Sequence, residues 1–310
     1  MKGPIRAAVV GVGYLGRFHA QKYQSLKGEV ELVGVCDLHA PQAEKVAKEL
    51  NVQVLKIEDL PGKVDIATVA TSTQNHFDAA QFLLSNHIAV NVEKPMTATI
   101  EQAETLLKTA ESKNTLLSVG HIERFSSYVK YFGQRSHDFD FIRLTRKADY
   151  KARGADVSVL YDLMIHDIDL VLKWYGPISD MLVMGSKVLS NTWDEVTALL
   201  KMRSGRTVQI EVSRVAHEVT RQIYGSGRNG SLLVNTGNGS WRAGKYQLAE
   251  PFSQWREGQI AKVDPLLEET KNFVYSFKNH LKPEVPGEAG LAAMKAVEWV
   301  DQELAFGKRV

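Results

Sequence analysis

The chain has 310 residues, of which 44% are hydrophobic and 24% are charged, a composition typical of a globular protein with two domains. Its formal net charge of +2 is too small to favour a nucleic acid or a membrane surface as a partner. The single cysteine, Cys36, excludes a disulfide within the chain, and no apolar run reaches the length of about 18 residues that predicts a membrane span. We therefore expect a cytoplasmic protein.

The first predicted element is a strand, Ile5–Val10, that ends in a glycine-rich turn and is followed by a helical pattern, Arg17–Leu26. The turn has the spacing Gly-x-Gly-x-x-Gly. Gly11 permits the tight turn, Gly13 lets the backbone approach phosphates, and Gly16 lets helix and strand pack closely. Tyr14 and Leu15 lie within the same turn. Because three glycines alone are a weak signal, the prediction of a dinucleotide site needs a second observation.

The second predicted strand supplies that observation. It ends in Cys36-Asp37, about 21 residues after the last glycine, where a dinucleotide site requires an acid for the ribose hydroxyls. Asp37 would repel a 2′-phosphate, and Leu38-His39-Ala40 offers no Arg or Lys to compensate. The sequence therefore predicts NAD rather than NADP as cofactor.

Strand and helix patterns alternate as far as about Gly120. The predicted strands are Ile5–Val10, Glu29–Cys36, Gln53–Leu55, Asp65–Val69, Ala89–Val92 and Leu116–Val119, and the later helices are Pro41–Leu50, His76–Ser85 and Ile100–Lys113. This alternation predicts an α/β fold with a doubly wound parallel sheet. In such a sheet ligands bind at the carboxyl ends of the strands.

A different pattern follows residue 120. Two helices, Ile122–Phe132 and Val157–Lys173, flank a strand near Phe139–Asp149. Runs of period two follow, separated by glycine-containing turns at 204–205, 225–230 and 237–239, and two helices end the chain, Pro265–Leu281 and Glu288–Phe306. We expect an NAD-binding domain over residues 1–122 and an α+β domain with an open, mostly antiparallel sheet over residues 123–310. The second domain would bind substrate and mediate oligomerisation, the last helix would pack back on the first domain, and substrate would bind between the two.

Glu93-Lys94-Pro95 follows the predicted strand Ala89–Val92, so Lys94 is expected at the same sheet edge as the glycine turn. Many lysines at strand ends are simply solvated. Pro95, however, restricts Lys94 to extended conformations and permits a cis bond, which fixes the direction of the ammonium group. A lysine beside a cofactor can polarise a substrate hydroxyl, or act as a base if its pKa falls.

Asp162 and His166 are four residues apart in the predicted helix Val157–Lys173 and should share one face. Histidine is suited to accepting an alcohol proton near neutral pH. The alternatives are a histidine satisfied within the core and, for Asp162 and Asp169, a solvated acidic stripe.

Further polar residues follow the strand Asp65–Val69. Thr71, Ser72 and His76 are candidates for cofactor contacts, although Ser72 or Thr73 would equally serve as a helix cap. Five other histidines occur singly, so no metal site is expected; they are His19, His87, His137, His217 and His280. The sequence contains neither a phosphate loop nor a Gly-x-Ser-x-Gly elbow, which argues against an NTPase or an α/β-hydrolase.

Taken together, these clusters resemble the glucose–fructose oxidoreductase / inositol dehydrogenase / rhizopine-catabolism (Gfo/Idh/MocA) family over nearly the whole chain. The resemblance rests on the glycine turn with His19-Ala20, on Asp37, on Thr71-Ser72 with His76, on Glu93-Lys94-Pro95, and on Asp162-x-x-x-His166. It implies that the cofactor contacts are Gly11, Gly13, Tyr14, Leu15, Gly16, Asp37, Thr71, Ser72, His76, Glu93 and Lys94.

The same resemblance implies the catalytic roles. Lys94 would polarise the alcohol that loses hydride, His166 would accept its proton, and Asp162 would position substrate or histidine; relatives differ in whether the lysine or the histidine takes the proton. It also implies a cis Lys94-Pro95 bond and a homodimer or homotetramer formed through the open sheet.

The sequence departs from the family at two places near Asp162. The family often has glycine two residues after this aspartate, where this chain has Met164, and a glycine-rich segment before it, where this chain has Asp156–Val159. The residues around Arg124 and Asp162 look more like the nucleotide-sugar branch, whose UDP-N-acetylglucosamine 3-dehydrogenases make a keto sugar for an aminotransferase. A diphosphate substrate needs cations, and Arg124, Arg153 and Arg214 are candidates, unless each is a surface or salt-bridged arginine.

The function we predict is therefore an NAD-dependent dehydrogenase acting on a sugar, most of all a nucleotide sugar at C3. Two alternatives remain from the sequence: a dehydrogenase of free aldoses, inositol or other cyclic polyols, and an NAD-binding regulator without turnover.

Overall fold

The computed structural model describes residues 3–150, 157–246 and 254–306. The chain divides into two compact units. The first unit contains residues 1–122 and 264–291, and the second contains residues 123–263 and 292–310. Two residues named in the sequence analysis, Arg153 and Asp156, lie outside the described residues. Val157 to Val159, which precede Asp162, lie within them.

The first unit is built on a six-stranded parallel sheet in the order β3-β2-β1-β4-β5-β6. Its strands are β1 (Ile5–Val10), β2 (Val30–Cys36), β3 (Gln53–Val54), β4 (Ile66–Val69), β5 (Ala89–Glu93) and β6 (Leu117–Gly120). Its helices are α1 (Tyr14–Ser25), α2 (Ala40–Leu50), α3 (His76–Ser85), α4 (Ile100–Ser112) and α7 (Pro265–Asn279), with short 3₁₀ turns η1 (Ile57–Asp59) and η2 (Thr73–Asn75). This order reverses direction between β1 and β4, where a doubly wound sheet binds its ligand. The predicted parallel sheet is confirmed.

The sequence patterns explain this unit directly. Every residue of β4 and β5 is buried, as expected for strands covered by helices on both faces. On α2 the buried residues Ala43, Val46, Ala47 and Leu50 follow the i, i+3, i+4, i+7 spacing of an apolar helix face. Helix α4 begins with a capping box, in which the Thr99 hydroxyl accepts the Gln102 amide hydrogen.

Helix α7, although distant in sequence, belongs to the first unit. Phe273 and Val274 join the core formed by β1, β2, α1 and α2. Lys22 of α1 pairs with Asp264, the N-cap of α7, at 2.7 Å. Helix α7 therefore packs beside α1, the helix that follows the glycine turn, and contributes buried side chains next to it.

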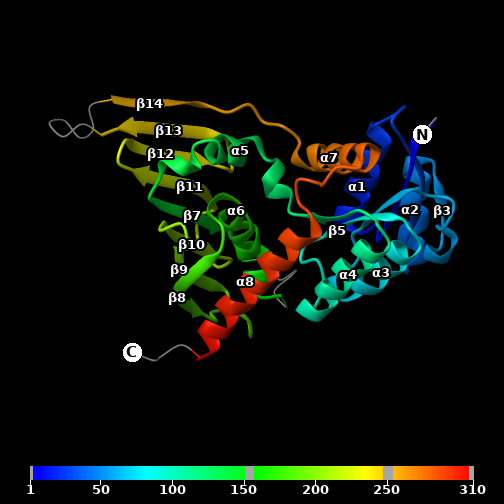
Figure 1. The fold of residues 1–310 in the computed structure, drawn as a ribbon, viewed down its shortest axis with the longest axis horizontal. Helices are drawn as coiled ribbons and strands as arrows, with labels where there is room; N and C mark the ends of the chain where they lie inside the picture. The colour runs from blue at the N-terminus through cyan, green and yellow to red at the C-terminus, as the bar shows by residue number, and fades with distance from the viewer. Residues whose placement is uncertain (1–2, 151–156, 247–253, 307–310) are drawn as a thin grey trace. The chain divides into compact units, whose positions relative to one another are not determined.

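The second unit contains an eight-stranded sheet in the order β14-β13-β12-β11-β7-β10-β9-β8 (Figure 1). Its strands are β7 (Phe141–Lys147), β8 (Ile178–Ser186), β9 (Glu195–Met202), β10 (Thr207–Ser213), β11 (Thr220–Gly227), β12 (Gly230–Asn235), β13 (Ser240–Lys245) and β14 (Gln254–Gln259). All neighbouring strands are antiparallel except β7 and β10. The predicted open, mostly antiparallel sheet is confirmed.

Two local predictions in this unit were wrong. The helix expected over Ile122–Phe132 is a 3₁₀ turn, η3 (Ile122–Phe125), followed by α5 (Ser127–Gly133), because the N-cap Ser126 has an extended backbone. The helix expected over Val157–Lys173 starts as a π-helix, η5 (Leu160–Met164), before α6 (Ile165–Tyr175).

The turn expected within residues 225–230 is present and connects β11 to β12 between Gly227 and Gly230. Gly225 lies inside β11, where a Cβ would come within 2.3 Å of the Phe139 ring. This glycine therefore permits close packing of an aromatic ring and does not form a turn.

Helix α8 (Gly287–Phe306) follows, with its first residues in the first unit and the remainder in the second. A further 3₁₀ turn, η4 (Ser136–Asp138), precedes β7. Across the three described ranges, no helix combines the length and the apolar character that a membrane crossing needs.

Candidate active site

The glycine turn connects β1 to α1 and is shaped by contacts that tolerate no side chain at two positions. Gly11 has φ +84°, and a Cβ there would lie 2.6 Å from the Thr71 amide nitrogen. A Cβ at Gly16 would lie 1.8 Å from the Gly11 carbonyl oxygen. A Cβ at Gly13, by contrast, would meet nothing within 4 Å. The turn is thus closed against the protein and open at its middle glycine, which is what a bound phosphate requires.

The N-terminus of α1 lies at the same place as the glycine turn. Its N-cap is Gly13, which provides no side-chain cap, and its first turn contains no acidic residue. Tyr14 and Leu15 are 64% and 45% exposed. The N–H groups at the start of a helix point out along its axis, and together with the positive end of the helix dipole they favour an anion here. These residues fit the pyrophosphate of a dinucleotide.

Asp37, at the end of β2, holds this loop in place. One carboxylate oxygen accepts the Val12 amide hydrogen at 2.8 Å, and the other accepts that of His39 at 2.8 Å. Each oxygen keeps a second lone pair, so a ribose hydroxyl can still donate to this carboxylate. The predicted ribose contact of Asp37 stays a prediction.

His76 connects two loops at the carboxyl edge of the sheet. Its ring nitrogens lie 3.1 Å from the Thr71 carbonyl oxygen and 3.0 Å from that of Pro95. The ring is buried, and burial lowers the pKa of His76. Ser72 is the N-cap of η2 but makes no side-chain cap hydrogen bond. His76 therefore fixes the loops that contain Thr71 and Lys94, while the predicted cofactor contacts of Thr71, Ser72 and His76 stay predictions.

The Glu93-Lys94-Pro95 segment leaves the end of β5 through a cis Lys94–Pro95 bond, as expected. Glu93 is buried, and one of its carboxylate oxygens lies 2.7 Å from His19 Nε2. The other accepts the Lys94 amide hydrogen at 3.2 Å. The Glu93 carboxylate thus supports the backbone of the predicted catalytic lysine, which is half-buried.

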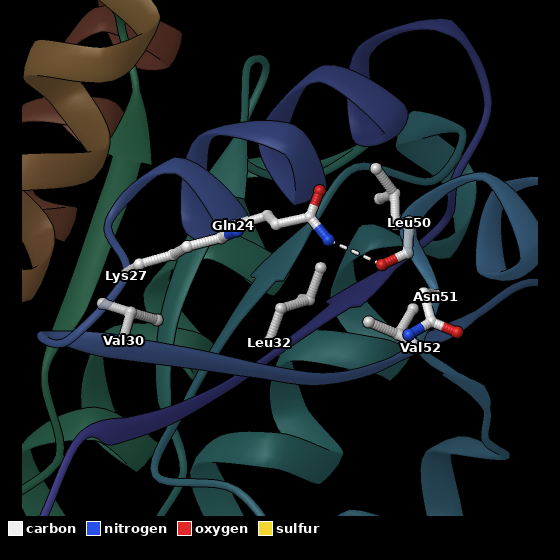
Figure 2. A pocket seen from close by; sticks show the side chains of 7 residues that line it. All are labelled: Gln24, Lys27, Val30, Leu32, Leu50, Asn51 and Val52. Atoms are coloured by element: carbon white, nitrogen blue, oxygen red, sulfur yellow. Dashed lines mark hydrogen bonds between the residues drawn. The ribbon is translucent and has the colours of Figure 1, made fainter.

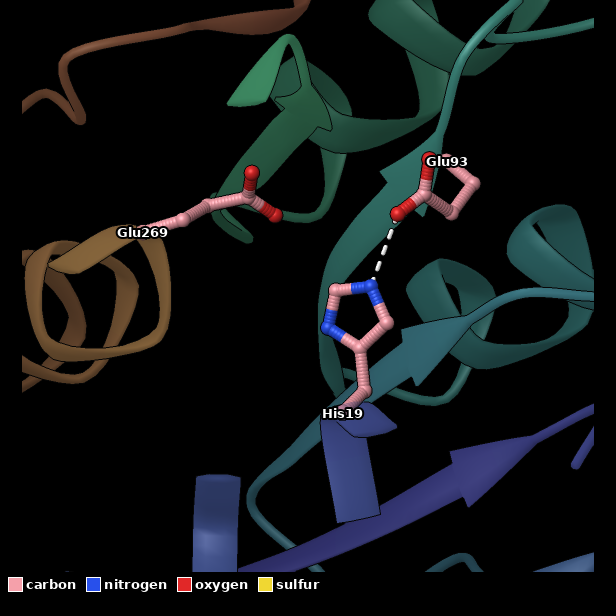
Figure 3. Close-up of side chains that lie close together, drawn as sticks. All are labelled: His19, Glu93 and Glu269. Atoms are coloured by element: carbon pink, nitrogen blue, oxygen red, sulfur yellow. Dashed lines mark hydrogen bonds and ion pairs between the residues drawn. The ribbon is translucent and has the colours of Figure 1, made fainter. Parts of the chain in front are cut away.

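His19 is the functional candidate that sequence reasoning missed. We expected it to occur singly, but it pairs with Glu93, 74 positions away, and both lie near Glu269 of α7 (Figure 3). The nitrogen and oxygen atoms that these three side chains offer lie within 4.8 Å of one another. The sequence signals were the place of His19 in the helix that follows the glycine turn and its part in the family resemblance, which gave it no role.

In the second unit, Asp162 lies in the π-helix and is exposed, and His166 lies in the first turn of α6 and is half-buried. A π-helix is often found at functional sites, because its wider turn redirects side chains. The neighbouring acids face inward. Asp167 pairs with Arg146 at 2.8 Å, and Asp169, only 1% exposed, accepts two hydrogen bonds from Arg124. The alternative of a solvated stripe is therefore wrong for Asp169.

Two of the three predicted substrate arginines also have carboxylate partners. Arg124 pairs with Asp169 at 2.6 Å, and Arg214 pairs with Asp194 at 2.7 Å. Burial raises the pKa of Asp194, but hydrogen bonds from Ser190, Leu189 and Arg214 outweigh it and lower that pKa, so the carboxylate is ionised. Both arginines thus stabilise the second unit, and their predicted diphosphate contacts, like that of Arg153, stay predictions.

A separate pocket of about 370 Å³ lies at the amino-terminal end of strand β2 in the parallel sheet of the first unit (Figure 2). It is lined by Val30 and Leu32 from the start of β2, by Gln24 near the end of α1, and by residues 50–52. Gln24 donates a hydrogen bond to the Leu50 carbonyl oxygen across it. Because it lies away from the carboxyl ends of the strands, it is not the cofactor site.

The strand order, the glycine turn and the uncapped helix N-terminus define a dinucleotide-binding protein of the doubly wound class. Family models agree with this class along most of the chain. Residues 5–121 match the oxidoreductase family with an NAD-binding Rossmann fold, and residues 118–233 match the Gfo/Idh/MocA C-terminal domain. The chain belongs to the Gfo/Idh/MocA family, and it is an NAD-binding oxidoreductase.

Individual relatives are named dehydrogenases. The UDP-N-acetylglucosamine 3-dehydrogenase of Acidithiobacillus ferrooxidans is 31% identical over 300 residues, which cover 94% of this chain and 95% of the relative. A solved structure of that enzyme superposes with a TM-score of 0.90 over 98% of this chain and 99% of its own. The scyllo-inositol 2-dehydrogenase (NAD(+)) of Bacillus subtilis is 24% identical over 76% of this chain and 75% of its own. The chain is therefore a dehydrogenase, and the alternative of a regulator without turnover loses its support.

Proposed function

We propose that this dehydrogenase oxidises a secondary alcohol of a nucleotide sugar, with UDP-N-acetylglucosamine at C3 as the substrate to test first. The observation that carries the proposal is the likeness to the Acidithiobacillus enzyme along nearly the whole of both chains. The sequence around Arg124 and Asp162 supports the same branch of the family. An aminotransferase that consumes the keto sugar is the partner that this reaction calls for.

Three side chains divide the work at the alcohol carbon. When bound, NAD supplies the acceptor for the hydride. The Lys94 ammonium donates a hydrogen bond to the reacting hydroxyl oxygen and stabilises the negative charge that develops on it. His166 accepts the hydroxyl proton, and Asp162 orients the substrate or the imidazole. The buried Glu93 carboxylate accepts the Lys94 amide hydrogen, and His76 lies at hydrogen-bonding distance from the Pro95 carbonyl oxygen, so both hold the loop that contains Lys94 in place.

The assay combines the protein, NAD and UDP-N-acetylglucosamine, with glutamate and a sugar aminotransferase to draw the reaction forward. We expect NADH absorbance and an amino sugar that mass spectrometry detects. Absence of NADH and of both keto and amino sugar rejects this substrate. The variant Lys94→Ala serves as the negative control, since it removes the group that polarises the hydroxyl.

A free sugar or polyol is the second candidate substrate, and the inositol dehydrogenases and the glucose-6-phosphate 3-dehydrogenase among the relatives favour it. A panel of aldoses, inositols and sugar phosphates, read as NADH formation, distinguishes the two. UDP alone provides a second criterion: it raises the melting temperature of a nucleotide-sugar enzyme and leaves that of a polyol dehydrogenase unchanged.

A further inference from the structure

Four buried side chains lie close together in the first unit, next to the end of β5 that leads into Lys94. We call them the β5 cluster; they are His19 of α1, Asn91 and Glu93 of β5, and Glu269 of α7. They are between 1% and 8% exposed. Figure 3 shows that the Glu269 carboxylate extends from α7 toward the hydrogen-bonded pair of His19 and Glu93. The cluster thus joins three elements at the point where β5 delivers Lys94.

The hydrogen bonds of the β5 cluster leave two atoms without a partner. Asn91 donates from its side-chain amide to one oxygen of Glu269 at 3.0 Å. The other oxygen of Glu269 and the amide oxygen of Asn91 are buried and have no partner. Both are acceptors as long as Glu269 is ionised. If the second oxygen of Glu269 carries a proton, that oxygen becomes a donor. It can then donate a hydrogen bond to the amide oxygen of Asn91, the residue whose amide nitrogen already donates to Glu269.

The charges in the β5 cluster point the same way. His19 and Glu93 form an ion pair, in which the hydrogen bond and charge of Glu93 outweigh burial and raise the pKa of His19. A second ionised carboxylate in this buried space would be an uncompensated negative charge. Burial, and then the charge of Glu93, raise the pKa of Glu269 to about 7. The other group that faces it is Tyr23, whose hydroxyl pairs with that of Thr68.

We propose that Glu269 is a positioning residue of the dehydrogenase site: it carries a proton, shares two hydrogen bonds with Asn91, and so fixes the end of β5 that carries Glu93 and Lys94. The effect on turnover rests on the role proposed above for Lys94. The protonation itself is independent of that role and of the identity of the substrate.

A bound divalent cation is the competing reading of the same three residues, His19, Glu93 and Glu269. It requires Glu269 to be ionised and His19 to be unprotonated. The two readings therefore predict opposite protonation states for one carboxyl group, and a measurement of that group decides between them.

The direct test is infrared spectroscopy of the full-length protein at pH 6, with Glu269→Gln as the informative variant. Glutamine keeps the shape and the amide hydrogen bonds but has no acid. Glu268→Gln is the matched control, because Glu268 is the neighbouring residue on α7 and pairs with Lys271 at the surface. We expect a carboxylic acid carbonyl band in the wild type and in Glu268→Gln that Glu269→Gln lacks. A wild type without this band, or a Glu269→Gln variant that retains it, overturns the proposal, as does a stoichiometric metal that only Glu269→Gln loses.

Thermal unfolding gives a second readout that needs no substrate. The pKa of Glu269 is higher in the folded chain than in the unfolded chain, so the folded state holds more protons between pH 4.5 and about 7. Stability from this group is complete below that window and is lost as the pH rises through it. The melting temperature of the wild type and of Glu268→Gln should therefore fall more between pH 5 and pH 8 than that of Glu269→Gln. Parallel curves for all three proteins contradict the proposal.

The positioning role is tested by turnover, once a substrate is known. Glu269→Ala removes the contacts with Asn91 and should lower kcat about tenfold or more, because a displaced catalytic group costs rate, with little change in the KM for NAD. Glu269→Gln should recover most of this loss. A Glu269→Ala protein that folds and has wild-type kcat overturns the positioning role but does not affect the proposed substrate. If the wild type fails to turn over the proposed substrate, the substrate proposal fails, and the infrared test of Glu269 protonation is unaffected.

Discussion

At the scale of single residues, Gly13 and Gly16 of the first turn have different roles, which substitutions can distinguish. Gly16 faces the Gly11 carbonyl oxygen, whereas Gly13 faces open space. Gly16→Ala should lower the free energy of unfolding by about 3 kcal/mol, since the new methyl group cannot be accommodated without moving backbone. Gly13→Ala should leave the melting temperature nearly unchanged and weaken NAD binding. Melting curves and NAD titration of the two variants check this; equal destabilisation by both would contradict it.

Asp37 combines a structural and a discriminating role. Asp37→Asn keeps one acceptor oxygen but loses the charge, so one of the hydrogen bonds from Val12 and His39 weakens, at a cost of about 1 kcal/mol in unfolding free energy. Because the repulsion of a 2′-phosphate is also lost, we expect the ratio of NADP to NAD affinity to rise. Binding of both dinucleotides is measured by titration, with the exposed Asp149→Asn as control. An unchanged ratio would mean that Asp37 does not face the ribose.

At the scale of elements, the first unit is the part that local patterns predict best. Its strands are short apolar runs, its helices have a clear apolar face, and glycine and proline mark the turns, so the doubly wound parallel sheet follows from the alternation of strands and helices. The π-helix was not predictable, because nothing in residues 160–164 distinguishes it locally from the α-helix that follows.

The candidate site was predictable to a smaller extent. Motifs single out Lys94, Asp162 and His166 as candidates, and their roles stay predictions; the pairings of the residues around them carry no such motif. Glu93 pairs with a histidine 74 positions away, Asn91 binds a glutamate 178 positions away, and Arg124 binds an aspartate 45 positions away. Contacts of this kind depend on how the elements pack, and a single sequence carries no signal of it.

Helix α6 depends on its inward-facing acids. Asp169→Asn leaves the Arg124 guanidinium without its buried counter-charge, and breaking such a pair costs about 3 kcal/mol. Asp162→Asn, on the exposed side of the preceding π-helix, should change the stability by less than about 0.5 kcal/mol. Denaturant unfolding of both variants checks this. A stable Asp169→Asn protein would contradict the role assigned to the pair.

At the scale of the whole molecule, the open sheet of the second unit presents an apolar face, and we propose that it forms a homodimer or homotetramer. Leu182 and Met184 of β8 are 61% and 64% exposed, and Leu199, the partner of Leu182 on β9, is 41% exposed. These residues share one face of the sheet, and contiguous exposed apolar surface marks an interface. Leu182→Glu should therefore reduce the molar mass measured by light scattering to that of a monomer. Val54→Glu, an exposed valine on β3, is the control; a wild type that is itself monomeric would contradict the proposal.

The central claim concerns two groups that belong to different units, the ammonium of Lys94 and the imidazole of His166. The most direct measurement is a crystal structure with NAD and the accepted sugar bound. The account predicts that Lys94 Nζ and a ring nitrogen of His166 both lie within hydrogen-bonding distance of the same substrate hydroxyl, beside the nicotinamide ring. A complex in which only one of them reaches that hydroxyl, or in which they lie on opposite sides of the sugar, would contradict it.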